Sequence, residues 1–377
     1  MSSKATTSST AGYVPVDPWS ERLFRGFADR SRDGNFDMND EPELSGATPG
    51  LPDRLRAGLE FLQARLLPVW ENLDRAAGRA QNCHRALAAA AIAGGGLAIL
   101  FGIGQLVCAA AGRAAWKHTL TWAELASVIV ALLAVAIGFK VKVHHRWLVC
   151  RQAAERLRSL KFESLSRPEL WCDPASWSAQ LIPEIEALTR LDYKAVEKWI
   201  RGGPAYPAPS GAPTCVIAPD EITALAEFYR WKRQAVQERF FTDRAAAHRD
   251  STWLLRLRAP VILFLLSVVM VVLHAILDLV THEAGSGASV ALLLVALAAG
   301  LPVLGFCLRA WFGAFELPRR ARLFEAKADQ LNTAIDWLQN DRQDAARTLY
   351  HIRHGEDFFL TEHREWCRLL SEAEWFL

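Results

Sequence analysis

The sequence lacks the features of several large classes of protein. Its 377 residues carry a formal net charge of only +2, so charge gives no reason to expect nucleic acid as a partner. The seven cysteines show no CxxC spacing, and no glycine-rich phosphate loop follows a strand pattern. No strand pattern and no nucleophile–base set are evident. We therefore expect a protein that is not an enzyme and that needs no cofactor.

Metal-binding signals are also incomplete. The acidic stretch Asp33–Leu44 imitates a calcium loop, but it has Met38 where the turn requires glycine and Leu44 where a bidentate glutamate belongs. No HExxH spacing exists, and His351 and His354 lie three apart on a charged helix. No metal site is expected.

Long apolar runs are what the sequence has instead. Uncharged stretches of 27, 15, 19 and 25 residues are Ala86–Gly112, Leu125–Phe139, Ala259–Leu277 and Ala284–Leu308. The second run reaches 21 residues if it is counted back to Thr119 across Glu124. About 20 helical residues cross the hydrocarbon core of a bilayer. The sequence therefore predicts an all-α integral membrane protein with four spans, in two antiparallel hairpins flanked by long amphipathic cytoplasmic helices.

The tetrapeptide DRAA occurs twice, at Asp74–Ala77 and at Asp243–Ala246, and each copy precedes a hairpin. An apolar stripe at helical spacing precedes the first hairpin, and a similar one precedes the second. A basic helix follows each hairpin. The pattern predicts a tandem repeat of helix, hairpin and helix.

The predicted organisation has four parts. Residues 1–50 form a polar, disordered tail, because they lack the apolar residues of a core or of a signal peptide. Residues 51–200 form the first unit, with spans at about 87–111 and 121–139. Residues 201–218 form a Pro- and Gly-containing linker. Residues 219–377 form the second unit, with spans at about 259–280 and 287–308.

Charge placement predicts the orientation. Arginine and lysine lie before and after both hairpins, whereas the second connector has none and the first has only Arg113 and Lys117. By the positive-inside rule both connectors face outward, and both termini and the linker are cytoplasmic. Trp116 and Trp122 suit the outer interface.

The helix before the third span carries a motif. It contains Tyr229, Arg233, Gln237, the pair Phe240–Phe241 and Ala245. This series resembles the SLATT family (SMODS and SLOG-associating two-transmembrane effector domains), in which a Tyr, an Arg four residues on, a Gln four further, a Tyr pair and an Ala occur. Because the pair is Phe–Phe here, hydroxyl groups are not essential at those positions.

The C-terminal stretch GEDFFLTEHREW is similar to the closing helix of that family. Glu356, Glu362 and Trp366 fall in the expected places. The first half is similar to a more divergent member, so the resemblance, which covers residues 55–374, is to a tandem SLATT protein.

The resemblance implies a function. Members of the family are proposed to be effectors in bacterial conflict systems that form pores or perturb the membrane once a partner senses infection. It implies an anti-phage system of the bacterial inner membrane with a separate sensor or nucleotide-synthase protein. We expect a homo-oligomer, because four helices enclose too little room for a conducting pore. The segment before residue 51 is too short for a sensor domain. The alternative is a membrane-anchored scaffold or sensor whose cytoplasmic helices recruit partners.

Four polar residues lie in or beside the predicted spans: Gln105, Glu124, His274 and Asp278. His274 and Asp278 are four apart and share one helical face. A charge in the middle of a bilayer is costly, so these groups either cap the hairpins near the outer interface or line a water-filled path. Both interpretations remain open at this point.

Overall fold

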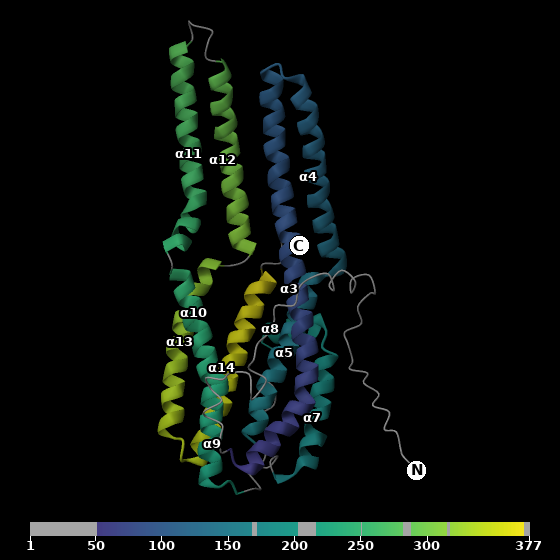
Figure 1. Cartoon of the computed structure of the whole chain (residues 1–377), viewed down its shortest axis with the longest axis vertical. Helices are drawn as coiled ribbons and strands as arrows, with labels where there is room; N and C mark the ends of the chain where they lie inside the picture. Colours follow the sequence, from purple (N-terminus) through teal and green to yellow (C-terminus); the bar gives the residue numbers. More distant parts are fainter. Residues whose placement is uncertain are drawn as a thin grey trace, which may run out of the picture. The chain divides into compact units, whose positions relative to one another are not determined.

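The structure is a computed structural model of the whole chain. It describes residues 51–167, 172–202, 216–249, 251–281, 288–314 and 317–372. Within these ranges every regular element is a helix (Figure 1). The predicted tail 1–50 and residues 203–215 of the predicted linker lie outside the described residues. For the described part of the chain, the all-helical prediction is confirmed.

The chain divides into two compact units. The helical unit comprises Met1–Cys83, Val143–Thr242 and Ala326–Glu372, and the span unit comprises His84–Lys142, Asp243–Glu325 and Ala373–Leu377. Each unit therefore combines residues from before and after the segment 201–218. Helix α3, Asp53–Ala110, contributes its first part to the helical unit and its last part to the span unit.

The span unit contains the apolar helices. These are the last part of α3 with α4 (Ala114–Val141), α11 (Ser251–Thr281) and α12 (Ala288–Ala314). All four are long and apolar enough to cross a membrane. Their large apolar side chains, such as Leu132, Phe264 and Leu293, are mostly exposed. Surface of this kind is unfavourable in water and is at home in lipid. By length and composition, this is a multi-pass membrane protein.

Small residues allow close contacts between these helices. A Cβ atom placed on Gly94 of α3 would lie 2.8 Å from the carbonyl oxygen of Ser127 in α4. A Cβ on Gly96 would lie 2.5 Å from Sγ of Cys307 in α12. The Ser267 hydroxyl of α11 donates a hydrogen bond to the carbonyl oxygen of Ala298 in α12, at 2.6 Å. Small residues serve this purpose in membrane helices because apolar burial gives no driving force in lipid.

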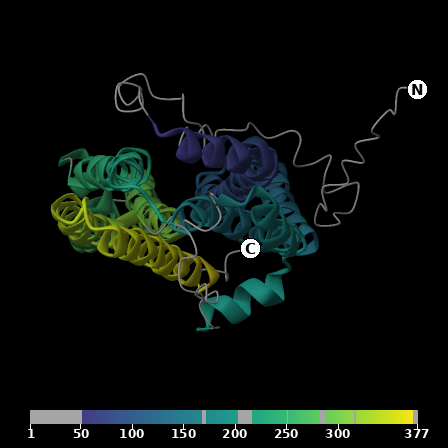
Figure 2. The same ribbon diagram turned by 90° about the horizontal axis from the view of Figure 1, so that it is seen from below.

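The helical unit is built from the first part of α3 and shorter helices. These are α5 (Val143–Leu165), α7 (Pro174–Thr189), α8 (Tyr193–Ile200), α9 (Pro219–Tyr229), the π-helix η2 (Arg230–Gln234), the first part of α10 (Ala235–Arg249), the last part of α13 (Leu317–Asn340) and α14 (Ala345–Glu372). α14 packs against α5, α8 and α9. Figure 2 shows these helices from below, with α14 in yellow.

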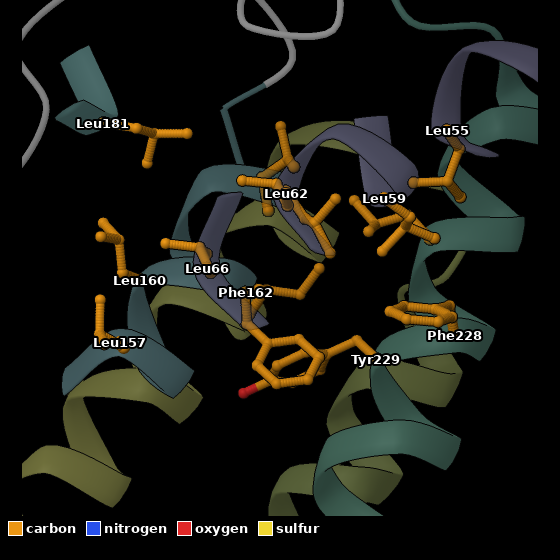
Figure 3. Packing of buried hydrophobic residues seen from close by; sticks show 14 of the residues in the cluster. Leu55, Leu59, Leu62, Leu66, Leu157, Leu160, Phe162, Leu181, Phe228 and Tyr229 are labelled. Carbon is orange, nitrogen blue, oxygen red and sulfur yellow. The ribbon is translucent and has the colours of Figure 1, made fainter. Parts of the chain in front are cut away.

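The apolar core of the helical unit begins with the predicted stripe of α3. Leu55, Leu59, Leu62 and Leu66 are fully buried, and Phe162 of α5 and Tyr229 of α9 pack into the same cluster (Figure 3). The spacing of three and four residues places the leucines on one helical face. Burial of this face holds α3 against α5 and α9.

Helix α5 differs from the basic amphipathic helix that its sequence predicts. Most of its residues are buried, and they include Arg156, Arg158 and Lys161, each at most 2% exposed. A buried cation is costly unless it is paired. Arg156 pairs with Glu163, and Arg158 donates to Glu155 at 2.9 Å. Because neighbouring helices cover α5 on several sides, the charges meet partners within the protein and little water.

Candidate functional site

Three residues of the SLATT-like motif meet in the interior of the helical unit. Arg233 Nη2 donates to Glu356 Oε2 at 2.9 Å, and Arg233 Nε donates to Glu356 Oε1 at 3.0 Å. The Tyr229 hydroxyl donates to Glu356 Oε1 at 3.0 Å. The side chains of Arg233 and Glu356 are 2% and 1% exposed. The Arg233 guanidinium and the Glu356 carboxylate thus form a buried ion pair through two hydrogen bonds, and the Tyr229 hydroxyl donates a third. The contact joins residues that are more than a hundred positions apart in the sequence.

The π-helix η2 helps to place this arginine. Its five residues, Arg230–Gln234, join α9 to α10, and the wider turn shifts the positions that face the interior. The guanidinium carbon of Arg233 lies 4.3 Å from the ring centre of Phe359 and 5.4 Å from that of Phe162. Arg233 Nη2 also reaches the hydroxyl of Ser159 in α5, at 3.5 Å. The arginine is thus held from α5 and α14 at once.

The electrostatics of this contact follow from burial. Burial raises the pKa of Glu356 above the usual range of a glutamate, and the Arg233 guanidinium opposes that rise. Burial and the neighbouring Glu356 carboxylate raise the pKa of the Tyr229 phenol well above its usual value. The phenol therefore stays protonated and remains a hydrogen-bond donor.

The other motif residues of the leading helix divide between surface and core. Phe241 is buried, Phe240 is 44% exposed, and Gln237 is half-buried. The two phenylalanine rings pack edge to face at 5.6 Å between centres. Of these three residues, only Phe241 is buried, and the motif residue Ala245 is buried as well.

The two other motif residues of α14, Glu362 and Trp366, lie in a second group of polar and aromatic side chains around α5, which we call the second polar layer. The Trp366 ring packs edge-on against Trp147 of α5, at 5.6 Å between centres, and stacks on His363 at 5.4 Å. Glu362 is half-buried beside the charges of α5. The structure does not bring Glu362 or Trp366 to the Arg233–Glu356 pair itself.

The second polar layer centres on α5. Arg151 pairs with Asp74 of α3 at 2.9 Å and with Glu155 at 2.6 Å, and Arg158 pairs with Glu155 at 2.9 Å. The Arg158 guanidinium also lies over the Trp70 ring of α3, at 5.3 Å. Asp74 belongs to the first DRAA copy, so that copy joins α3 to α5. Arg244, the arginine of the second copy, has no described side chain.

Glu362 and His363 have shifted acidities in this layer. Burial, reinforced by the Glu155 carboxylate, raises the pKa of Glu362 to about 7. Burial lowers the pKa of His363 to about 4, although Glu155 opposes that change. The two arginines hold the pKa of Glu155 far below its usual range despite its burial. A carboxyl group that titrates near neutrality is a recognised mark of a functional position.

In the span unit, two of the four predicted polar residues meet. Gln105 of α3 donates through Nε2 to Glu124 Oε2 of α4. The single hydrogen of the Thr121 hydroxyl is shared between two acceptors, Gln105 Oε1 at 3.2 Å and the carbonyl oxygen of Lys117 at 2.9 Å. The sequence did not single out Thr121. Thr121 lies one turn before Glu124 on α4, and this spacing could have indicated that the two side chains are neighbours.

The other pair is described in part. His274 is half-buried in α11, seven residues after Ser267, and its Nδ1 atom has no hydrogen-bond partner among the described residues. The side chain of Asp278 lies outside the described residues. Whether these groups line a path or cap the helices therefore stays a prediction.

Ser159, Glu155 and Arg151 of α5 were also not predicted as site residues. Their helix was predicted only to be basic and amphipathic, and the packing of α14 and α3 against it shows which of its charges are buried. No group of three or more His, Cys, Asp or Glu in the described part of the chain could hold a metal ion.

The fold and the two polar sites define an all-helical protein with four candidate membrane-spanning helices and a helical unit held by buried ion pairs. No match to a family model, to a curated protein or to a solved structure was found.

Proposed function

We propose that the chain is a non-enzymatic bacterial membrane effector that forms pores or perturbs the membrane. It acts as a homo-oligomer in a conflict system triggered by a separate sensor or nucleotide-synthase protein. In this proposal the spans form two antiparallel hairpins in the inner membrane, and both chain termini are cytoplasmic.

The observation that carries the proposal is the meeting of Tyr229, Arg233 and Glu356 at one buried contact. These residues are part of the motif that carries the resemblance to the SLATT family, and they come from opposite ends of the second half of the sequence. Their contact gives that spacing a physical reason, because an arginine buried at this depth requires a carboxylate partner. The contact also supports the view that the resemblance is not a coincidence of sequence.

The span unit supports an oligomer. Four helices enclose little space, and polar side chains such as Gln105 and Glu124 bond to each other. The exposed apolar faces of α4, α11 and α12 leave room for lipid or for further copies of the chain. A conducting path would then lie on an axis between several copies.

The test is the membrane potential of cells that express the chain. Induced expression is followed with a potential-sensitive dye, first alone and then together with the genes that flank it in its genome. We expect depolarisation in at least one condition. The matched variants are Glu356→Gln, which breaks the buried contact, and Glu71→Gln, whose exposed partner is Arg75 on the same helix. Depolarisation should be lost only with Glu356→Gln.

The second candidate function is a membrane-anchored scaffold. It is favoured by Trp337 of α13 and Tyr350 of α14, which are 50% and 61% exposed. Both rings pack against His351. Exposed aromatic residues are typical anchors of protein interfaces. Cells that keep their potential in both conditions, with the protein present in the membrane, would support the scaffold and contradict the effector.

A further inference from the structure

Glu124 is a carboxylate within a candidate membrane span, and no cation of the described residues pairs with it. It lies in α4, within the candidate span Ala115–Val141. In the described part of the chain it takes part in no ion pair, and its polar partner is the Gln105 amide. An isolated ionised carboxylate is unfavourable in hydrocarbon, so such a group has to be neutralised.

The depth of Glu124 follows from the inner end of the helix. Lys140 is exposed near the end of α4 and anchors that end among the lipid head groups. The hydrocarbon core takes about 20 residues, which counts back from Lys140 to Leu120. Glu124 then lies about 6 Å inside the outer boundary at 1.5 Å per residue. Trp116 and Trp122, both exposed on α4, lie nearer to the head groups.

The surroundings of the carboxyl group form an ordered chain of donors. Gln105 Oε1 lies 3.2 Å from the Thr121 hydroxyl, and the NH₂ group of the same amide points toward Glu124 Oε2. The second oxygen, Oε1, faces Gly102 of α3, where an added Cβ would lie 3.5 Å away. Among the described residues nothing donates a hydrogen bond to Oε1. The glycine leaves this oxygen free to carry a hydrogen atom.

The amide decides which cation neutralises the group. A metal ion would require several oxygen ligands, but Gln105 presents its NH₂ group, whose hydrogens repel a metal ion. The amide oxygen is already engaged by Thr121. We propose that Glu124 is a proton-binding site, which takes a proton from the outer aqueous side onto Oε1 and holds it as a neutral acid hydrogen-bonded to Gln105. This site does not depend on the proposed effector activity, whereas its access from the outer side rests on the proposed topology.

Labelling with dicyclohexylcarbodiimide tests the site in the full chain in membrane vesicles. The reagent takes the acid proton on one nitrogen, and the carboxylate oxygen adds to its central carbon. The resulting O-acylisourea rearranges to a stable N-acylurea, which mass spectrometry locates. We expect an adduct at Glu124 whose yield falls as the pH is raised and is the same in sodium and choline chloride. Glu71 in the same molecule is the exposed control and should stay unlabelled.

Two variants complete the experiment. Glu124→Gln should remove the adduct, and its amount in the membrane is measured from other peptides of the chain. Gln105→Leu removes a donor to the ionised form, so labelling should persist to higher pH than in the parent. If that variant does not reach the membrane, the parent profile and Glu124→Gln decide. Labelling of Glu124 no stronger than that of Glu71 would overturn the proposal, and protection by sodium would replace the proton with a metal cation.

Discussion

At the scale of single residues, the helical unit depends on buried charges that come in complementary sets. Arg233 and Glu356 form one set, and Arg151, Glu155 and Arg158 form the other. Such pairs add little net stability compared with well-packed apolar residues, but removal of one partner leaves an unpaired buried charge. Single substitutions at these positions are therefore more severe than their contact energy indicates.

The first prediction concerns Glu356. Glu356→Gln leaves the Arg233 guanidinium buried without a counter-charge, so the free energy of unfolding should fall by about 3–5 kcal/mol. Thermal unfolding of the detergent-solubilised protein measures this, with Glu71→Gln as the control that changes stability by less than about 0.5 kcal/mol. The double variant Arg233→Met with Glu356→Leu should recover part of the loss. A single variant as stable as the control would contradict the assignment.

The second prediction concerns the pH dependence of Glu362. Its pKa is raised to about 7 in the folded protein, so its contribution to stability is present at low pH and is lost as pH rises to about 7. Glu362→Gln should therefore be more stable than the parent at pH 8, by about 1–3 kcal/mol, and nearly equal to it at pH 5. Because the variant and the parent are compared at the same pH each time, the opposite contribution of His363, whose pKa is lowered to about 4, cancels. A difference independent of pH would contradict this interpretation.

At the scale of elements, close helix contacts decide the packing of the spans. Gly94 faces α4, whereas a Cβ on the adjacent Gly95 would meet no other atom within 4 Å. In the helical unit, a Cβ on Gly355 of α14 would lie 2.4 Å from the Tyr229 hydroxyl oxygen. At Gly94 and Gly355, glycine is present in spite of its low helix propensity, because a neighbouring element occupies the space that a Cβ atom would need.

The third prediction compares the two neighbouring glycines. Gly94→Ala should lower the unfolding temperature in detergent, because the new methyl group would lie 2.8 Å from a backbone oxygen that cannot rotate away. Gly95→Ala should leave it unchanged or raise it slightly, since alanine favours the helix by up to about 1 kcal/mol. Equal effects of the two substitutions would show that α3 and α4 do not pack in this way.

At the scale of the whole molecule, the question is how the four apolar helices cross the membrane. Their length and composition make them candidate spans. Lysine and arginine lie outside the apolar runs and are sparse in the two connectors, which favours connectors on the outer side. This orientation also places Glu124 near the outer face.

The fourth prediction is the topology. Reporter fusions at Leu377 and within Arg201–Pro213 should behave as cytoplasmic, and a fusion at Ser286 as external. Paired reporters, one active only inside and one only outside, provide the measurement and serve as controls for each other. A cytoplasmic signal at Ser286 would rule out four spans with both termini inside.

The sequence by itself determined the helical class, the four apolar runs and the leucine stripe of α3. These features are local and periodic: span length is set by bilayer thickness, and Leu55, Leu59 and Leu62 share a face by helix geometry. The site residues Tyr229, Arg233 and Glu356 were all selected through the resemblance. The spacing of four between Tyr229 and Arg233 gives no information about their common partner Glu356.

Only the tertiary structure decided which polar groups are buried and with whom they pair. Arg156 and Arg158 resemble solvated residues of a basic helix, and they are buried because α3 and α14 cover α5. Gln105 and Glu124 meet because α3 and α4 lie side by side in this region. Burial of a charge depends on long-range packing, and the periodicity of one segment does not carry information about the segments that come to lie against it.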